Sequence, residues 1–255
     1  MGELIFIGLG LFDEKDITVK GKEAVARADV VYAEFYTSRL AGATIEDMKR
    51  ELGVKVEVLS REQVESQDVV LNAASDKTVA FLTAGDTMAA TTHVEMRVRA
   101  KERGIKTDVI HGISIVSAVP SILGVMHYKF GRTVTLPFLR ERGYPRSPYD
   151  HIKGNMDIGL HTLVLLDIDE EQEQYMTVNE GVEALLKLEG DVGGGVITDD
   201  TVMAGLARVG SPEPEIKVGS PNELLEHDFG GGLQCMVVFG ELHFMEEEAL
   251  GLFYS

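Results

Sequence analysis

Two glycines one residue apart, Gly8 and Gly10, directly follow the apolar run of residues 4–7. Glycine has no Cβ, so a turn built on it can bend sharply and let its backbone approach a ligand. The dinucleotide-binding fingerprint requires a third glycine at position 13, where this chain has Asp13. A carboxylate there, with that of Asp16 nearby, would repel a pyrophosphate. The turn therefore resembles a nucleotide-binding turn but is poorly suited to phosphate.

Further acidic residues stand where predicted strands end. Glu34 closes the next strand at about the spacing of the acidic residue that binds ribose in dinucleotide sites, so that alternative stays open. Asp86 follows Gly85 and would lie at the same sheet edge as Gly10. By spacing alone, Asp86 is a turn residue that caps the following helix. Acidic groups without a basic partner favour a ligand that carries a cation or many hydroxyls.

Signatures of other chemistries are missing from the sequence. The histidines are scattered, and no two have the i, i+4 spacing of paired ligands on one helix face, so no metal site is expected. There is no Gly-x-Ser-x-Gly nucleophile elbow and no phosphate-binding loop with lysine. Asp199 and Asp200 are predicted to lie in a polar turn after a strand. Cys235 lies in an apolar stretch and is predicted to be buried rather than nucleophilic.

Composition narrows the class of protein. The 255 residues are 44% hydrophobic and 26% charged, which is typical of a globular protein with a substantial core. A formal charge of −18 disfavours nucleic acid and anionic membranes as partners and is best explained as a solubility feature. The single cysteine fits a reducing compartment, and no apolar run approaches the ~20 residues of a membrane span. We therefore expect a cytoplasmic protein.

The first half alternates between strand and helix patterns, which predicts βα units in a largely parallel sheet. Thr44 and Asp47 form a predicted N-terminal cap of the second helix, and Gly53 its end. The expected strands are 3–8, 29–35, 55–59, 78–86 and 107–112, and the expected helices are 18–28, 44–52, a polar helix after residue 59, and 92–104.

The pattern loosens around residues 113–131, where Pro120 and Gly124 interrupt an apolar segment. We expect a boundary there between two α/β domains, residues 1–125 and 126–255. In the second half the strands are closer together, which predicts a mixed sheet with hairpins. The expected strands are 161–168, 194–200, 201–210, 215–219 and 233–242, and the expected helices are 177–189 and 221–227.

Several longer strings point to a known family. They are "FIGLGLFDEKDITVKG", "AEFYTS", "FLTAGD" with "ATTH", "HGISIVSA", "YKFG", "GLHTLVLLDI", "TDDT" and "ARVGS". In this order, between Ile5 and Gly240, they closely resemble the archaeal methyltransferases of diphthamide biosynthesis, which belong to the tetrapyrrole methylase superfamily. The resemblance covers nearly the whole chain.

This resemblance implies two α/β domains with S-adenosylmethionine in the cleft between them, S-adenosylhomocysteine as its product, and a homodimer. The family has histidine at the position of Gln234, whose amide can still donate and accept hydrogen bonds. The family's cofactor contacts carry over to Leu11, Asp86, Ala89, Ser114, Ile115, Leu166, Ala207 and Gln234.

The implied reaction is methylation, to the trimethylammonium form, of the amino group on the modified histidine of elongation factor 2. An α-amino group has a pKa near ~8, so a neutral fraction exists without a strong base. We therefore expect no dedicated catalytic residue.

Two other functions stay open at this stage. A methyltransferase acting on a small tetrapyrrole is disfavoured, because those enzymes usually carry Gly-Pro-Gly-Asp-Pro where this chain has Gly10-Leu11-Phe12-Asp13, and Gly-Asp-Pro where it has Gly85-Asp86-Thr87. An oxidoreductase or non-enzymatic nucleotide-binding module is disfavoured by the missing third glycine.

Overall fold

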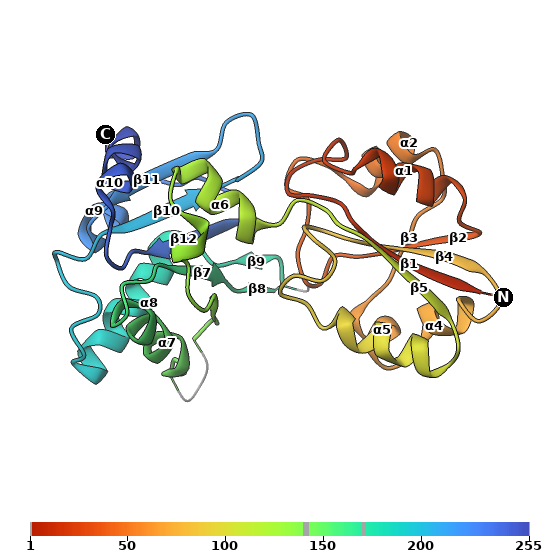
Figure 1. The fold of residues 1–255 in the computed structure, drawn as a ribbon, viewed down its shortest axis with the longest axis horizontal. Helices are drawn as coiled ribbons and strands as arrows, with labels where there is room; N and C mark the ends of the chain where they lie inside the picture. The colour runs from red at the N-terminus through yellow and green to blue at the C-terminus, as the bar shows by residue number, and fades with distance from the viewer. Residues whose placement is uncertain (1, 140–142, 170–171, 255) are drawn as a thin grey trace. The chain divides into compact units, whose positions relative to one another are not determined.

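The computed structural model describes residues 2–139, 143–169 and 172–254. Contacts within the chain divide it into two compact units, Met1–Ile115 and Val116–Ser255 (Figure 1). The boundary predicted from the sequence, after residue 125, lies beyond the end of helix α6 (Ile115–Leu123). The division by contacts lies after Ile115, so nearly all of α6 is grouped with the second unit. The division into domains 1–125 and 126–255 stays a prediction.

The first unit contains a five-stranded sheet in the order β3-β2-β4-β1-β5, in which every neighbouring pair of strands is parallel. The strands are β1 (Glu3–Gly8), β2 (Val30–Glu34), β3 (Glu57–Val58), β4 (Thr78–Thr83) and β5 (Lys106–Ile110). The helices are α1 (Val19–Ala26), α2 (Ile45–Leu52), α3 (Arg61–Glu65), α4 (Val69–Ala73) and α5 (His93–Glu102). The predicted parallel sheet is confirmed.

Helices cover both faces of this sheet, with α1 and α2 on one side and α4 and α5 on the other (Figure 1). Alternate residues of β1 serve the two faces: Ile5 and Ile7 belong to one buried apolar cluster, and Leu4 and Phe6 to the other. A strand buried on both faces has a continuous apolar sequence, as residues 4–7 do. Parallel pairing then brings the carboxyl ends of the strands to one edge.

The second unit contains a mixed five-stranded sheet in the order β11-β10-β12-β7-β6, in which only the β6–β7 pair is parallel. Its strands are β6 (Val134–Leu136), β7 (Thr162–Leu166), β10 (Met203–Ala207), β11 (Glu215–Gly219) and β12 (Gln234–Val238), and β8 (Ile168–Asp169) pairs with β9 (Gln174–Tyr175). The helices are α6, α7 (Ser147–Met156), α8 (Val178–Val192), α9 (Pro221–Glu226) and α10 (Phe244–Leu250), with 3-10 turns η1 (His127–Lys129) and η2 (Gly251–Phe253). The predicted mixed sheet is confirmed.

The strand expected at residues 194–200 is absent, and that prediction is wrong. The carboxylate of Glu189 accepts hydrogen bonds from the backbone N–H groups of Gly195 (2.7 Å), Val196 (2.7 Å) and Ile197 (2.9 Å). Burial opposes the charged carboxylate, but these donors together with Tyr149 hold the pKa of Glu189 at about 2. Because a side chain satisfies these amides, they are not available to a neighbouring strand.

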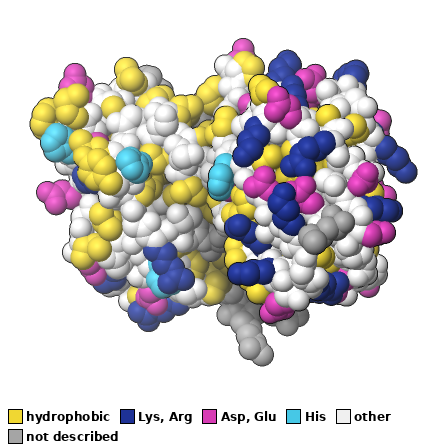
Figure 2. All heavy atoms as spheres, turned by 45° about the vertical axis from the view of Figure 1, so that its right-hand side comes forward, with side chains coloured by type: hydrophobic (Ala, Val, Ile, Leu, Met, Phe, Trp, Pro, Cys, Tyr) yellow, Lys and Arg dark blue, Asp and Glu magenta, His cyan; other side chains and the backbone are white. Residues whose placement is uncertain are grey.

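Local capping agrees with the sequence. Thr44 and Asp47 form a capping box at the start of α2, and Gly53 ends that helix in the left-handed region at φ 65°. Helix α6 was not expected, because Pro120 lies inside it. Among the described residues, no helix combines the length and the apolar character needed to cross a bilayer. Figure 2 shows Lys and Arg interspersed with Asp and Glu on one face of the first unit, so charges of both signs share this surface.

A buried carboxylate organises the second unit around the "YKFG" segment. Glu246, fully buried in α10, accepts hydrogen bonds from the backbone N–H of Met126 (2.9 Å) and Nζ of Lys129 (2.7 Å). Its Oε1 lies 3.3 Å from Nε2 of His161, and Oε2 accepts the N–H of His243 at 2.9 Å. Burial opposes ionisation, but these donors hold the pKa of Glu246 at about 2. One ionised side chain thus joins η1, β7 and α10.

We predict that Glu246→Gln lowers the free energy of unfolding by about 2–4 kcal/mol, because Lys129 loses its charged partner inside the protein. The pKa of Glu246 is lower in the fold than in the unfolded chain. Its stabilising contribution is therefore complete above about pH 4.5 and is lost as the pH falls toward 2. Urea unfolding followed by circular dichroism should show less acid sensitivity in the variant. The exposed Glu247→Gln serves as control, and equal effects of both changes would contradict this role.

Candidate functional site

Three glycines at the carboxyl edge of the parallel sheet bring the ends of β1, β4 and β5 into backbone contact. A Cβ on Gly8 would lie 2.6 Å from the carbonyl oxygen of Gly85 and 2.8 Å from Cα of Gly112. A Cβ on Gly112 would meet the same Gly85 oxygen and the carbonyl carbon of Gly8. These distances are too short for any side chain. Gly8 is therefore required by packing between neighbouring strands rather than by the approach of a ligand.

Gly10 has a different constraint. It has φ 87°, a region that side chains rarely adopt, and a Cβ there would overlap Cβ of Asp16. The N–H of Gly10 donates to the oxygen of Gly85 at 3.2 Å, and the N–H of Gly85 donates to the oxygen of Gly10 at 2.6 Å. The turn after β1 is thus joined to the turn after β4.

The carboxylate of Asp16 fills the inside of the first turn. Its Oδ2 accepts the N–H of Leu11 at 3.0 Å and that of Phe12 at 2.8 Å. Asp13 accepts the N–H of Lys15 at 2.9 Å. Backbone N–H groups of a glycine turn are what usually bind phosphate. Here the chain's own carboxylates accept them, which supports the inference from the sequence that this turn does not hold phosphate.

Asp86 lies in the turn after β4. Its Oδ1 accepts the N–H of Met88 at 3.0 Å, and its Oδ2 lies 2.8 Å from Nδ1 of His111, at the end of β5. The side chain of Asp86 is 10% exposed, whereas that of His111 is 75% exposed. Asp86 therefore closes its own turn, as the spacing indicated, but it does not cap α5, whose N-cap is Thr92. Its second oxygen faces an open, titratable group.

The predicted cofactor residues of the first unit share this edge. They are Leu11 after β1, Asp86 and Ala89 after β4, and Ser114 and Ile115 after β5, and all are partly exposed. A parallel sheet brings such positions together because its strands end on the same side. Their contacts with a cofactor stay predictions.

The predicted cofactor residues of the second unit also share one sheet edge. Ala207 ends β10 and pairs directly with Gln234, the first residue of β12, while Leu166 ends β7, the strand next to β12. The side chain of Gln234 accepts the N–H of Val178 at 2.8 Å and donates to the oxygen of Gly230 at 2.8 Å. Both ends of this amide are therefore bonded within the unit.

Glu34 does not serve as a ribose-binding acid, because it is fully buried. It accepts hydrogen bonds from the N–H (3.1 Å) and Oγ1 (2.5 Å) of Thr37, and its Oε1 lies 3.4 Å from Nε2 of buried His93. Burial raises the pKa of Glu34 to about 7 despite these donors, and burial lowers the pKa of His93. This pair was not predicted, because nothing in the spacing of residues 34 and 93 along the sequence indicates that they are in contact.

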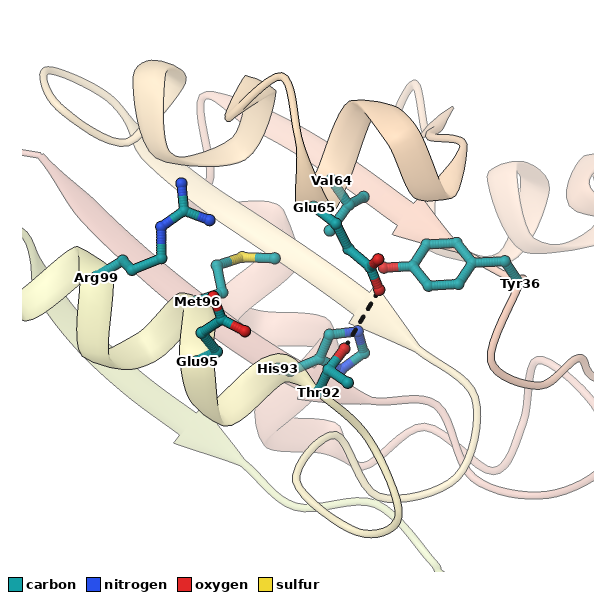
Figure 3. Close-up of a pocket in the computed structure, with 8 residues that line it drawn as sticks. All are labelled: Tyr36, Val64, Glu65, Thr92, His93, Glu95, Met96 and Arg99. Atoms are coloured by element: carbon teal, nitrogen blue, oxygen red, sulfur yellow. Dashed lines mark hydrogen bonds between the residues drawn. The ribbon is translucent and has the colours of Figure 1, made fainter. Parts of the chain in front are cut away.

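His93 also borders a surface pocket between α3 and α5 (Figure 3). Tyr36 and Glu65 approach this pocket from the side opposite α5, and Thr92 Oγ1 lies 3.4 Å from Oε1 of Glu65. The hydroxyl of Tyr36 is buried without a hydrogen-bond partner among the described residues. The pocket thus opens close to the buried Glu34–His93 pair.

Other candidates from the sequence have structural roles. Cys235 is buried, as predicted, and burial raises the pKa of its thiol to about 12, which disfavours the thiolate form. Asp199 and Asp200 lie in a turn, where Asp199 accepts a hydrogen bond from Asn222 at 3.1 Å. Within the described ranges, no cluster of three His, Cys, Asp or Glu side chains could hold a metal ion.

Comparison with known proteins gives consistent matches. Residues 3–217 match the model of the tetrapyrrole (corrin/porphyrin) methylases. The chain is 54% identical to a diphthine synthase of Methanocella arvoryzae, covering 97% of this chain and 96% of that protein. It is 50% identical to a diphthine synthase of Methanosarcina acetivorans, covering 97% and 94%. A crystal structure of diphthine synthase superposes with a TM-score of 0.90 at 39% identity, covering 99% of this chain and 96% of that one.

We predict that Gly112→Ala destabilises the protein by at least about 2 kcal/mol, because its methyl group would collide with backbone of β1 and of the turn after β4. Gly154→Ala is the matched control: Gly154 lies inside α7 with no atom within 4 Å of the added Cβ. Alanine there should be neutral or stabilise by up to about 1 kcal/mol. Thermal or urea unfolding of both variants measures the difference. Equal stabilities would contradict the packing role of Gly112.

Proposed function

The chain belongs to the tetrapyrrole (corrin/porphyrin) methylase family, and from its similarity to diphthine synthases we infer that it is a methyltransferase of diphthamide biosynthesis. The observation that carries this inference is the extent of the similarity. It spans nearly the full length of the chain and of its relatives, and therefore both units rather than a single shared domain.

We propose S-adenosylmethionine as the methyl donor. The edge of the first unit suits a cationic ligand better than a phosphate, because Asp16 already accepts the free amides of the first turn and Asp86 adds a partly exposed carboxylate. When bound, this donor supplies a methyl group on a positively charged sulfur, which an amine can attack directly. The fit therefore depends on the negative charge of Asp86 and on turn amides that already donate to Asp16 and are not free to bind a phosphate.

The proposed contacts come from strand ends in both units. In the first unit they are Leu11, Asp86, Ala89, Ser114 and Ile115, and in the second they are Leu166, Ala207 and Gln234. The side chain of Gln234 is bonded to Val178 and Gly230, so we propose that its backbone makes the contact there. Asp86 has the further role of balancing positive charge on the donor and on the methylated amine.

The proposed substrate is the amino group on the modified histidine of elongation factor 2, methylated to the trimethylammonium form. A neutral amine is required for attack, and an amine with a pKa near ~8 supplies it without a dedicated base. The chain's contribution is then alignment of the two reactants and exclusion of water. We further expect a homodimer in the cytoplasm, as the family resemblance implies.

Incubation with radiolabelled S-adenosylmethionine tests this function. We expect label on elongation factor 2 that carries the modified histidine and none on unmodified factor. Label that appears only on an added porphyrinoid precursor would instead identify a tetrapyrrole methyltransferase. A thermal shift with a nicotinamide cofactor but none with S-adenosylmethionine would favour the nucleotide-binding module.

We predict that Asp86→Ala weakens binding of S-adenosylmethionine, which carries the sulfonium charge, by at least about tenfold, which corresponds to about 1.4 kcal/mol. The change removes both the carboxylate and the acceptor for the N–H of Met88. Asp86→Asn keeps an acceptor for that N–H and removes only the charge, so it separates the two effects. Calorimetry measures both affinities. Unchanged affinity in Asp86→Ala would exclude Asp86 from the donor site.

A further inference from the structure

The strings "AEFYTS" and "ATTH" meet at a buried pair that the proposed reaction does not use. Glu34 belongs to the first string and His93 to the second, and both are fully buried apart from about 1% of His93. Glu34 lies at the end of β2, directly beside Thr83 of β4. The strand β4 leads into residues 84–92, the loop that carries Asp86 and Ala89.

His93 holds this loop through its side chain. Its Nδ1 lies 3.3 Å from the carbonyl oxygen of Thr87, one residue beyond Asp86. The hydroxyl of Thr91 donates to the same oxygen at 3.3 Å, and the N–H of His93 donates to that hydroxyl at 3.2 Å. Thr92 provides no side-chain cap for α5. The start of α5 is therefore fixed largely by these contacts.

The loop needs such a constraint because part of it is strained. Ala90 has φ 56°, in the left-handed region that residues with a side chain rarely adopt. Such a conformation persists only where surrounding contacts hold it. The ring of His93 is itself fixed by an edge-to-face contact with Phe81, with ring centroids 5.2 Å apart.

The acceptor at Thr87 determines where the ring protons lie. A carbonyl oxygen only accepts, so Nδ1 of His93 must carry hydrogen. In the neutral ring Nε2 then has a lone pair, and this lone pair faces Oε1 of Glu34 at 3.4 Å. Two acceptors at this distance repel each other unless a proton lies between them. A single proton, on either atom, converts the contact into an attraction.

We propose that Glu34 and His93 share one proton and act as positioning residues that hold the loop 84–92 in the conformation that binds the methyl donor. This inference rests on the proposed function, since it assumes that Asp86 and Ala89 contact the donor. The pair lies between the turn after β2 and the loop after β4: Thr37 donates to Glu34, Oε1 of Glu34 lies 3.4 Å from Nε2 of His93, which has no other partner among the described residues, and Nδ1 of His93 contacts the oxygen of Thr87.

The sign of the pH dependence follows from the chemistry of the pair. The pKa of Glu34 is raised to about 7, so the shared proton is present below neutral pH and is lost as the pH rises through about 7. Donor affinity should fall over that interval. The groups that face the pair from neighbouring elements are Tyr36 after β2, Arg61 and Glu65 on α3, and Glu95 and Arg99 on α5.

Glu34→Gln tests the shared proton without disturbing the packing. Its amide oxygen accepts the N–H of Thr37, and its NH2 group, in the place of Oε1, donates permanently to Nε2 of His93, as the protonated acid would, while the hydroxyl of Thr37 turns to accept from the same NH2 group. We expect calorimetry with S-adenosylhomocysteine to show an affinity in wild type that falls about tenfold as the pH rises from about 6 to 8. In Glu34→Gln the affinity should stay at the low-pH value.

Substitutions of His93 test whether its contact with the carbonyl oxygen of Thr87 fixes the loop 84–92. His93→Asn keeps a donor near the position of Nδ1, whereas His93→Phe fills the space without a donor. We expect His93→Phe to weaken binding about tenfold or more at every pH and His93→Asn to restore part of the loss. If His93→Phe and His93→Asn weaken binding to the same extent, the contact between His93 and Thr87 does not position the loop.

Two controls isolate the pair. Tyr36→Phe removes an unpartnered hydroxyl from the neighbouring pocket and should leave the pH profile of wild type intact. His111→Gln, made in the wild-type and Glu34→Gln proteins, removes the exposed imidazole that contacts Asp86. The difference between wild type and Glu34→Gln should persist in this background.

These measurements distinguish an error in the proposed methyl donor from an error in the proposed shared proton. If wild type does not bind S-adenosylhomocysteine at any pH, the proposed donor is wrong. If wild type binds it and Glu34→Gln keeps the same pH profile, the shared proton is wrong and the donor site stands. Nitrogen NMR of His93 gives an independent measurement: hydrogen on Nδ1 is expected, and a neutral ring with hydrogen only on Nε2 would overturn the proposal.

Discussion

Close backbone contact among Gly8, Gly85 and Gly112 is the constraint on which the site of the first unit depends. Strands of a parallel sheet end on one side, but their turns diverge unless something joins them. Here the absence of side chains at Gly8 and Gly112 lets the turns after β1 and β5 touch each other and the carbonyl oxygen of Gly85 after β4, and hydrogen bonds between Gly10 and Gly85 connect the turns after β1 and β4. The residues predicted to bind the donor lie directly after these contacts. Their shared position therefore follows from packing rather than from any ligand.

Acidic residues close together in this edge have different roles because their surroundings differ. Asp16 faces inward and accepts two backbone N–H groups, so its charge is used within the turn. Asp86 accepts one N–H and directs its other oxygen toward exposed His111. Glu34 is removed from water altogether and faces His93. Asp86 is partly exposed and accepts a single backbone N–H, which is why charge selection is assigned to it.

Carboxylates that accept several hydrogen bonds recur as organising groups, and the donors around them together with their burial decide their protonation. Glu189 and Glu246 each receive several backbone or charged donors, and both have a pKa of about 2. Glu34 receives neutral donors from Thr37 and lies against a neutral ring, and its pKa is raised to about 7. The first two stay ionised and hold loops in place at every physiological pH. Of these three carboxylates, only Glu34 has a pKa near neutrality, so only its protonation state changes near physiological pH.

The sequence by itself determined the alternation of strands and helices, the parallel and mixed sheets, the cap of α2 and the family. These features depend on local periodicity, on turn chemistry and on motifs that are read along the chain. The tertiary structure alone decided that Gly8 serves packing, that residues 195–197 bond to Glu189 instead of forming a strand, and that Glu34 meets His93. Each of these depends on atoms brought together from distant positions, and burial, which sets the charge of Glu34, exists only after those positions have met.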